Sequence, residues 1–281
     1  MNAITLGLIA ALSWGIHDIT IRYLSRSVPI LNAILVVLTV GAVFQASVVL
    51  WSGEPLALSS SAVLLSVIAG AAFLIAGLGL YYAFKRGPVG LVAPLIATYP
   101  VFSVLFAFVE GRTLTGLQIL AIGTVVAGSA IVAVTSASED EGNSVKVQAI
   151  LLSLLASFAF AVSFHFSQVA ALQASELASG MITRFTAWIL IVAIVLVKRV
   201  PLNIPMRAYA PLGLMGLCDG LALLCIIAAA SLPNPAFASV AASTFGICTI
   251  ILAWVWLKER LSLAQIAGCA LAFAGIGYLS L

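Results

Sequence analysis

Charged residues are scarce in this chain, and so are the patterns that mark catalytic sites. Charged side chains make up 7% of the 281 residues, against about 25% in soluble domains, so this surface is not suited to contact with water. The sequence contains no GxSxG or HExxH motif, which argues against an intramembrane hydrolase or peptidase, and no phosphate-binding loop for ATP. We therefore expect a protein without a cofactor and without enzymatic activity.

Cysteine is also rare, and the four cysteines lack the spacing of a metal site. Cys218, Cys225, Cys248 and Cys269 all lie inside apolar segments, with no CxxC pair and no Cys/His pattern. We expect neither a disulfide nor a bound metal ion.

Apolar sequence is abundant: 63% of the residues are hydrophobic and the mean hydropathy is +1.24. The apolar residues form segments of roughly 20 residues, the length of a helix that crosses about 30 Å of hydrocarbon. A transmembrane barrel would need alternating polar and apolar residues, so the sequence predicts an all-α polytopic membrane protein. We predict ten transmembrane helices, at residues 3–23, 30–51, 61–84, 89–109, 115–135, 147–171, 177–197, 208–230, 235–257 and 261–281.

The basic residues between these segments predict the orientation of the chain. The connections after the odd-numbered segments hold almost all of them, whereas the even-numbered connections and the termini hold only Arg112. Lysine and arginine favour the cytoplasmic side of a membrane. Both termini are thus expected outside, in a protein integral to the bacterial inner (plasma) membrane.

The two halves of the chain resemble each other. Gln118 and Gly128 are ten residues apart, as are Gln265 and Gly275 at the corresponding place in the second half. Five helices per half is an odd number, so the halves would enter the membrane in opposite orientations, as inverted repeats do. The predicted division is a first five-helix repeat at 1–135, an acidic connecting loop at 136–146 and a second five-helix repeat at 147–281.

Several short motifs occur together in one order along the chain. They are Ser13-Trp14-Gly15 with Arg22, Tyr81-Tyr82-Ala83, Pro100 with the apolar run to Glu110, and Lys258-Glu259-Arg260-Leu261-Ser262 leading to Gln265, Gly268 and Gly275. In these motifs the chain resembles the EamA-type metabolite exporters of the drug/metabolite transporter superfamily. The resemblance implies a secondary transporter of small organic metabolites, often amino acids, with a cavity between its halves. His17 and Asp18 depart from the family pattern, so the relatives' substrates are not carried over.

Asp219 and Arg184 are the clearest candidates for the substrate site. Asp219 lies near the middle of a predicted helix, where a charge is costly unless it faces a cavity or a partner. It could bind a substrate amine or carry a proton, or it could be a structural carboxylate. Arg184 could bind a substrate carboxylate, pair with Glu176 or Asp219, or extend to the membrane surface. If both face the cavity, they suit a zwitterion.

Three further ionisable residues are candidates. Asp18 lies one helical turn before Arg22, so a structural ion pair between them is an alternative to a role in binding. His17 and His165 occupy related regions of the two halves, and either could titrate near neutral pH. We expect all three to line the substrate site, with His165 and Asp219 as candidates for proton coupling.

Aromatic residues and prolines complete the candidate site. We expect Tyr99, Tyr82, Trp188 and Phe245 at the substrate, although most membrane Trp and Tyr residues are packing or interface residues. Pro94 and Pro100 flank Tyr99, and because each interrupts a helical hydrogen bond, we expect a hinge there.

These features favour a secondary transporter that exports small organic metabolites such as amino acids by alternating access. Alternatives are an exporter of organic cations or drugs and a membrane subunit that transports nothing. The expected partners are the lipid bilayer, a small-molecule substrate and protons as a candidate coupling ion; no nucleic acid is expected. The sequence leaves open whether the protein is a monomer or a homodimer.

Overall fold

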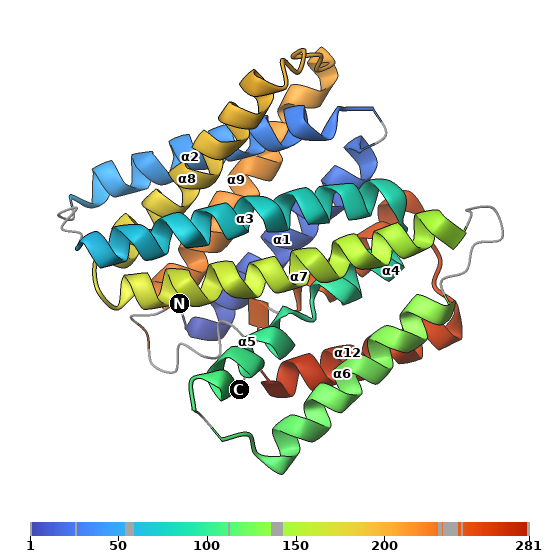
Figure 1. Ribbon diagram of the computed structural model, residues 1–281. Helices are drawn as coiled ribbons and strands as arrows, with labels where there is room; N and C mark the ends of the chain where they lie inside the picture. Colours follow the sequence, from blue (N-terminus) through green and yellow to red (C-terminus); the bar gives the residue numbers. More distant parts are fainter. Residues whose placement is uncertain are drawn as a thin grey trace.

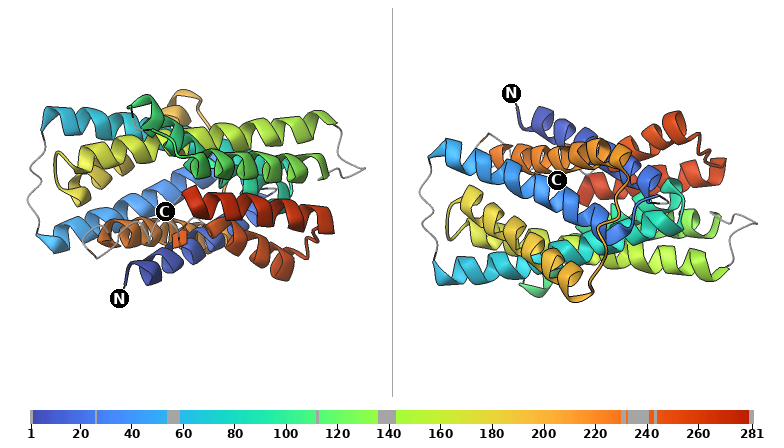
Figure 2. Two further views of the ribbon diagram at one scale, coloured as in Figure 1. Left: turned by 90° about the horizontal axis from the view of Figure 1, so that it is seen from below. Right: turned by 90° about the horizontal axis from the view of Figure 1, so that it is seen from above.

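The computed structural model describes residues 2–25, 27–53, 59–111, 113–135, 143–229, 232, 241–242 and 244–279. Within these ranges the chain is helical and contains no strand, which confirms the all-α class. The long helices run roughly side by side in one bundle (Figures 1 and 2). The helices are α1 (Ala3–Leu24), α2 (Ile30–Ser52), α3 (Ser60–Arg86), α4 (Val89–Ile96), α5 (Tyr99–Val109), α6 (Gly116–Thr135), α7 (Asn143–Ala171), α8 (Glu176–Val197), α9 (Met206–Ala229), α11 (Phe245–Leu252), the π-helical η1 (Ala253–Leu257) and α12 (Leu263–Leu279).

Eight helical segments in the described ranges are long and apolar enough to cross a membrane. They are α1, α2, α3, the α4–α5 unit, α6, α7, α8 and α9. Two shorter apolar helical segments, Phe245–Leu257 and Leu263–Leu279, follow. The latter falls within the tenth predicted segment, whereas the ninth, 235–257, lies partly outside the described residues. The count of ten spans therefore stays a prediction.

The predicted fourth helix is interrupted between its two prolines. α4 ends at Ile96 and α5 begins at Tyr99, because Pro100 has no N–H to donate to the carbonyl one turn earlier. The hydroxyl of Thr98 fills part of the gap, donating to the Leu95 carbonyl at 2.7 Å and lying 3.0 Å from the Ser157 hydroxyl of α7. The irregular backbone between α4 and α5 is thus covered by protein, as a membrane environment requires.

The closest helix pairs join the first half of the chain to the second. α3 packs along α7, α1 along α9, and α6 along α12 at one edge of the bundle (Figure 1). Glycines let α6 and α12 approach: a Cβ at Gly128 would lie 2.5 Å from the Gly268 carbonyl oxygen, and Gly275 is equally crowded. Gly123 of α6 has no such neighbour: a Cβ built on it meets nothing within 4 Å.

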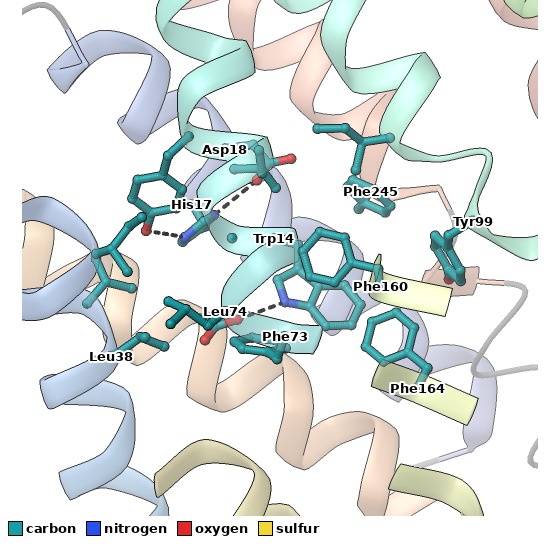
Figure 3. A pocket seen from close by; sticks show the side chains of 17 residues that line it. Trp14, His17, Asp18, Leu38, Phe73, Leu74, Tyr99, Phe160, Phe164 and Phe245 are labelled. Carbon is teal, nitrogen blue, oxygen red and sulfur yellow. Dashed lines mark hydrogen bonds and ion pairs between the residues drawn. The ribbon is translucent and has the colours of Figure 1, made fainter. Parts of the chain in front are cut away.

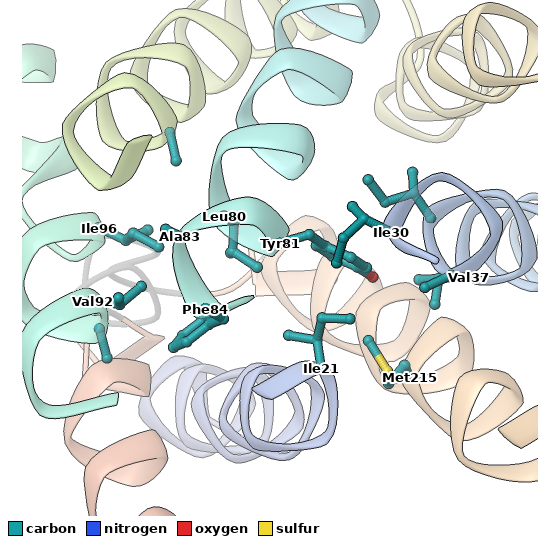
Figure 4. Close-up of a cluster of buried hydrophobic side chains, with 14 of the residues drawn as sticks. Ile21, Ile30, Val37, Leu80, Tyr81, Ala83, Phe84, Val92, Ile96 and Met215 are labelled. Atoms are coloured by element: carbon teal, nitrogen blue, oxygen red, sulfur yellow. The ribbon is translucent and has the colours of Figure 1, made fainter. Parts of the chain in front are cut away.

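The apolar core lies where α1, α2, α3, α4 and α9 meet (Figure 4), and residues of α8 also belong to it. Ile21, Phe84 and Met215 are fully buried in it, with Val37 beside them. Lipid tails are as apolar as these side chains, so close packing rather than exclusion of water holds the helices together. This core supports one side of a pocket between the halves.

Candidate functional site

A mostly apolar pocket lies inside the bundle, between helices of both halves (Figure 3). Helices α1, α2, α3, α7 and α9 supply most of its wall, and α4, α5 and α11 supply the rest. The lining residues are Trp14, His17, Asp18, Ile34, Val37, Leu38, Phe73, Leu74, Gly77, Leu80, Tyr81, Ile96, Tyr99, Phe160, Phe164, Asp219 and Phe245. The pocket thus brings together five of the residues proposed from the sequence: His17, Asp18, Tyr99, Asp219 and Phe245.

Arg184 and Asp219 form an ion pair between α8 and α9. The Arg184 Nη1 donates to Asp219 Oδ2, and the guanidinium lies 5.0 Å from the centre of the Phe73 ring. The Arg184 residue is 1% exposed and does not line the pocket, whereas Asp219 does. Trp14 Nε1 donates to the other oxygen of Asp219 at 3.3 Å. Of the environments considered from the sequence, Arg184 therefore forms the ion pair with Asp219. Its guanidinium lies behind the residues that line the pocket.

His17, Asp18 and Tyr81 form a hydrogen-bonded chain at the pocket, and Figure 3 shows His17 and Asp18 of this chain. His17 Nδ1 lies 3.0 Å from Asp18 Oδ1, and His17 Nε2 lies 3.0 Å from the Tyr81 hydroxyl. The Thr249 hydroxyl on α11 donates to Asp18 Oδ2 at 3.5 Å. Arg22 takes no part: its Nε donates to Glu259. The Asp18–Arg22 pair that the helical spacing suggested is not formed.

Aromatic rings form a continuous wall on the side of α3, α5 and α7. The ring of Phe160 contacts Phe73 and Phe164, with centroids 5.9 Å and 5.7 Å apart, and Phe164 contacts Tyr99 at 5.4 Å. Rings of this kind accept flat apolar groups, and their faces also attract cations. Sequence reasoning missed the three phenylalanines, because a transmembrane chain with 14 phenylalanines gives no sign of which ones face a cavity.

Besides Arg184, three residues proposed for the substrate site lie outside the pocket lining. His165 Nε2 lies 3.1 Å from Glu110 Oε1, at partly exposed side chains. Tyr82 lies under the Arg86 guanidinium, and Trp188 Nε1 donates to the Thr39 hydroxyl at 3.0 Å. Adjacent helical residues point about 100° apart, so when Tyr81 and Phe164 face the pocket, their neighbours Tyr82 and His165 turn away.

The electrostatic character of the pocket comes from two carboxylates with different partners. Asp219 has a permanently charged partner, and Asp18 has a histidine and a hydroxyl. Within the described ranges no group of three or more His, Cys, Asp or Glu side chains could hold a metal ion. The arrangement suits binding of a small molecule with an apolar body and a polar, nitrogen-bearing group.

Comparisons with known proteins agree with this fold. The profile of the EamA-like transporter family matches residues 1–134 and 147–281. A solved structure, described only as the crystal structure of a protein, is similar in fold, with a TM-score of 0.70 at 18% sequence identity. That likeness covers 98% of this chain and 94% of the other. No curated protein matches the chain.

Proposed function

Because this chain belongs to the EamA-like transporter family, we propose that it is a secondary transporter that exports small organic metabolites, such as amino acids, by alternating access. The chain is an integral membrane protein with apolar helices long enough to cross the bilayer. The observation that carries the proposal is the pocket itself, which has an aromatic wall and two carboxylates, and to which helices of both halves contribute.

Two inverted repeats, at 1–135 and 147–281, are the proposed architecture. The family profile matches two ranges that nearly coincide with these, and the main helix pairs join one half to the other. A pocket between two such units can open to either side when one unit rocks against the other. We propose that the protein lies in a bacterial inner membrane with both termini outside, the orientation that the distribution of basic residues favours.

Polar side chains of the two halves contact each other at both proposed faces. At the face proposed as cytoplasmic, Glu259 accepts from Arg22 Nε at 3.1 Å and from the backbone N–H of Val89 at 2.8 Å. Arg22 Nη1 also donates to the Phe84 carbonyl at 2.8 Å. At the other face, Glu110 pairs with His165. We propose that opening towards the cytoplasm breaks the Arg22–Glu259 pair.

Organic cations are a second candidate substrate class. The observation that favours them is the position of Arg184, which is paired with Asp219 and buried behind the wall, while both carboxylates line the pocket. A substrate carboxylate would find no free guanidinium among the lining residues, whereas an ammonium group would find Asp18.

Flux into proteoliposomes from a mixed pool of amino acids, amines and organic acids tests the proposed function. We expect saturable uptake that empty liposomes lack, because the pocket offers a site for a small amphipathic molecule. Uptake that includes amino acids supports the first substrate class, and uptake of amines alone supports the second. If nothing moves under a substrate gradient or a proton gradient, the transport proposal is contradicted.

A further inference from the structure

The two carboxylates of the pocket differ in how their charges are balanced. The charge of Asp219 is balanced by Arg184, which stays protonated at any physiological pH. Asp18 is 2% exposed, and the polar side chains that contact it are His17 and Thr249. Arg22, on the same helix, is engaged with Glu259. Among the described residues, Asp18 therefore has no permanent cation in contact with it.

A buried carboxylate without a countercharge is strongly disfavoured inside a membrane protein. Asp18 can be balanced in two ways that the geometry allows. A proton can reside on the His17–Asp18 pair, either on the carboxyl or on Nδ1 of the imidazole, which lie 3.0 Å apart. Alternatively, a cationic group of a bound substrate can take its place, since Asp18 and His17 both line the pocket.

The groups that surround the His17–Asp18 pair permit either a proton or a substrate cation to balance the charge of Asp18. From α9, Asp219 adds negative charge that Arg184 of α8 offsets. From α3, the Tyr81 hydroxyl contacts His17 Nε2 at 3.0 Å. From α11, the Thr249 hydroxyl contacts Asp18, and Cys248 lies beside Gly15.

Resting on the proposed transport function, we propose that the Tyr81–His17–Asp18 chain is a proton-binding site that exchanges one proton for the ammonium group of the substrate. When the pocket is empty, the pair holds one proton, and the chain around it is neutral. When an ammonium group enters, that proton leaves to the side to which the pocket is open. The cycle is then substrate/proton antiport, with protons entering the cell as an amine-bearing metabolite leaves.

The hydrogen bonds of His17 can be formed in both of its charge states. In its neutral form, His17 donates from Nδ1 to Asp18 and accepts at Nε2 from the Tyr81 hydroxyl, which satisfies every polar atom of the imidazole. In its protonated form, the Nε2 donates to the same hydroxyl, whose oxygen has lone pairs to accept. Both charge states of His17 are thus hydrogen-bonded without movement of the helices.

A measurement without substrate tests the site directly. His17 and His165 are the only histidines, and Asp18, Asp140 and Asp219 the only aspartates, so ¹⁵N-histidine and ¹³C-aspartate labels give few NMR signals. In a His165→Asn background, we expect the His17 and Asp18 signals to change together over the pH range in which the protein stays folded, as coupled groups do. In the Asp18→Asn variant, the pH at which the His17 signal changes should differ from that of the native protein. If neither signal changes in this range, the site holds no exchangeable proton and the proposal is overturned.

Proteoliposome flux then separates this proposal from the transport function. We expect an acid interior to increase uptake of external amines or amino acids in the native protein. We expect Asp18→Asn to lose that dependence and to take up these substrates more slowly, because it lacks the carboxylate that pairs with the ammonium group. Asp140→Asn, the same substitution in the acidic connecting loop predicted at 136–146, is the matched control and should keep the dependence on the pH gradient. The proton site is overturned, but the transport function is not, if native flux does not depend on the pH gradient. The same conclusion follows if Asp18→Asn keeps the dependence on the gradient. An absence of native flux contradicts the transporter, and the NMR result still decides the proton site.

Discussion

Replacement of Gly77 by phenylalanine is expected to abolish transport and to leave the protein folded. Gly77 lines the pocket from α3, and a Cβ built on it meets nothing within 4 Å, so the new side chain can leave the helix there and extend into the cavity. The ring would occupy space that the substrate needs, and we expect initial flux to fall on the order of tenfold or more, since a packed site does not absorb so large a group. The measurement is flux per folded protein, with folding checked by thermal unfolding.

Gly123→Phe is the matched control for this variant. Gly123 also has open space around its Cβ, but it lies on the exposed surface of α6 and does not line the pocket. We expect Gly123→Phe to transport like the native protein. Equal flux in Gly77→Phe and the native chain would show that the substrate does not pass through this pocket.

Loss of one partner of the Arg184–Asp219 pair should cause the largest loss of stability. Both groups are buried, so Arg184→Met leaves a carboxylate without its cation, at a cost of about 3–5 kcal/mol. In detergent micelles this should lower Tm on the order of 10 °C. The double variant Arg184→Met/Asp219→Asn removes both charges and should recover much of that loss, because no unpaired charge stays buried.

Thermal unfolding of the native protein, both single variants and the double variant gives the coupling energy of the pair. A double variant as unstable as the sum of the singles would mean that the two charges do not stabilise each other. The ion pair would then not explain why Arg184 is buried beside Asp219. The Arg184 guanidinium would again be a candidate for binding substrate carboxylates.

The helical class and the interruption of the fourth predicted helix could be predicted from local sequence. Apolar length determines which segments can cross a membrane, and Pro100 removes a backbone donor wherever it stands in a helix. The break between Ile96 and Tyr99 falls between the two prolines proposed as a hinge. Whether it bends during transport stays a proposal.

The partners of the charged residues could not be predicted, because they depend on which helices meet. Arg184 had three possible environments by sequence, and only the packing of α8 and α9 around α2 brings it to Asp219. The spacing of Asp18 and Arg22 suggested a local pair, but Glu259, far along the chain, binds Arg22 instead. His165 lies outside the pocket lining because its neighbour Phe164 faces inward.

Accessibility of a single cysteine in the pocket tests the central claim, alternating access, most directly. In a background without the four native cysteines, Gly77→Cys would place a thiol in the pocket, and a membrane-impermeant maleimide would be applied to each face of reconstituted vesicles in turn. We predict that the thiol reacts from both faces. We also predict that Glu259→Gln, which removes the charge that Arg22 pairs with and weakens the contacts to Arg22 and Val89, increases the rate from the cytoplasmic face at the expense of the other. A thiol that reacts from neither face, or from one face only whether or not Glu259 is present, would contradict alternating access at this pocket.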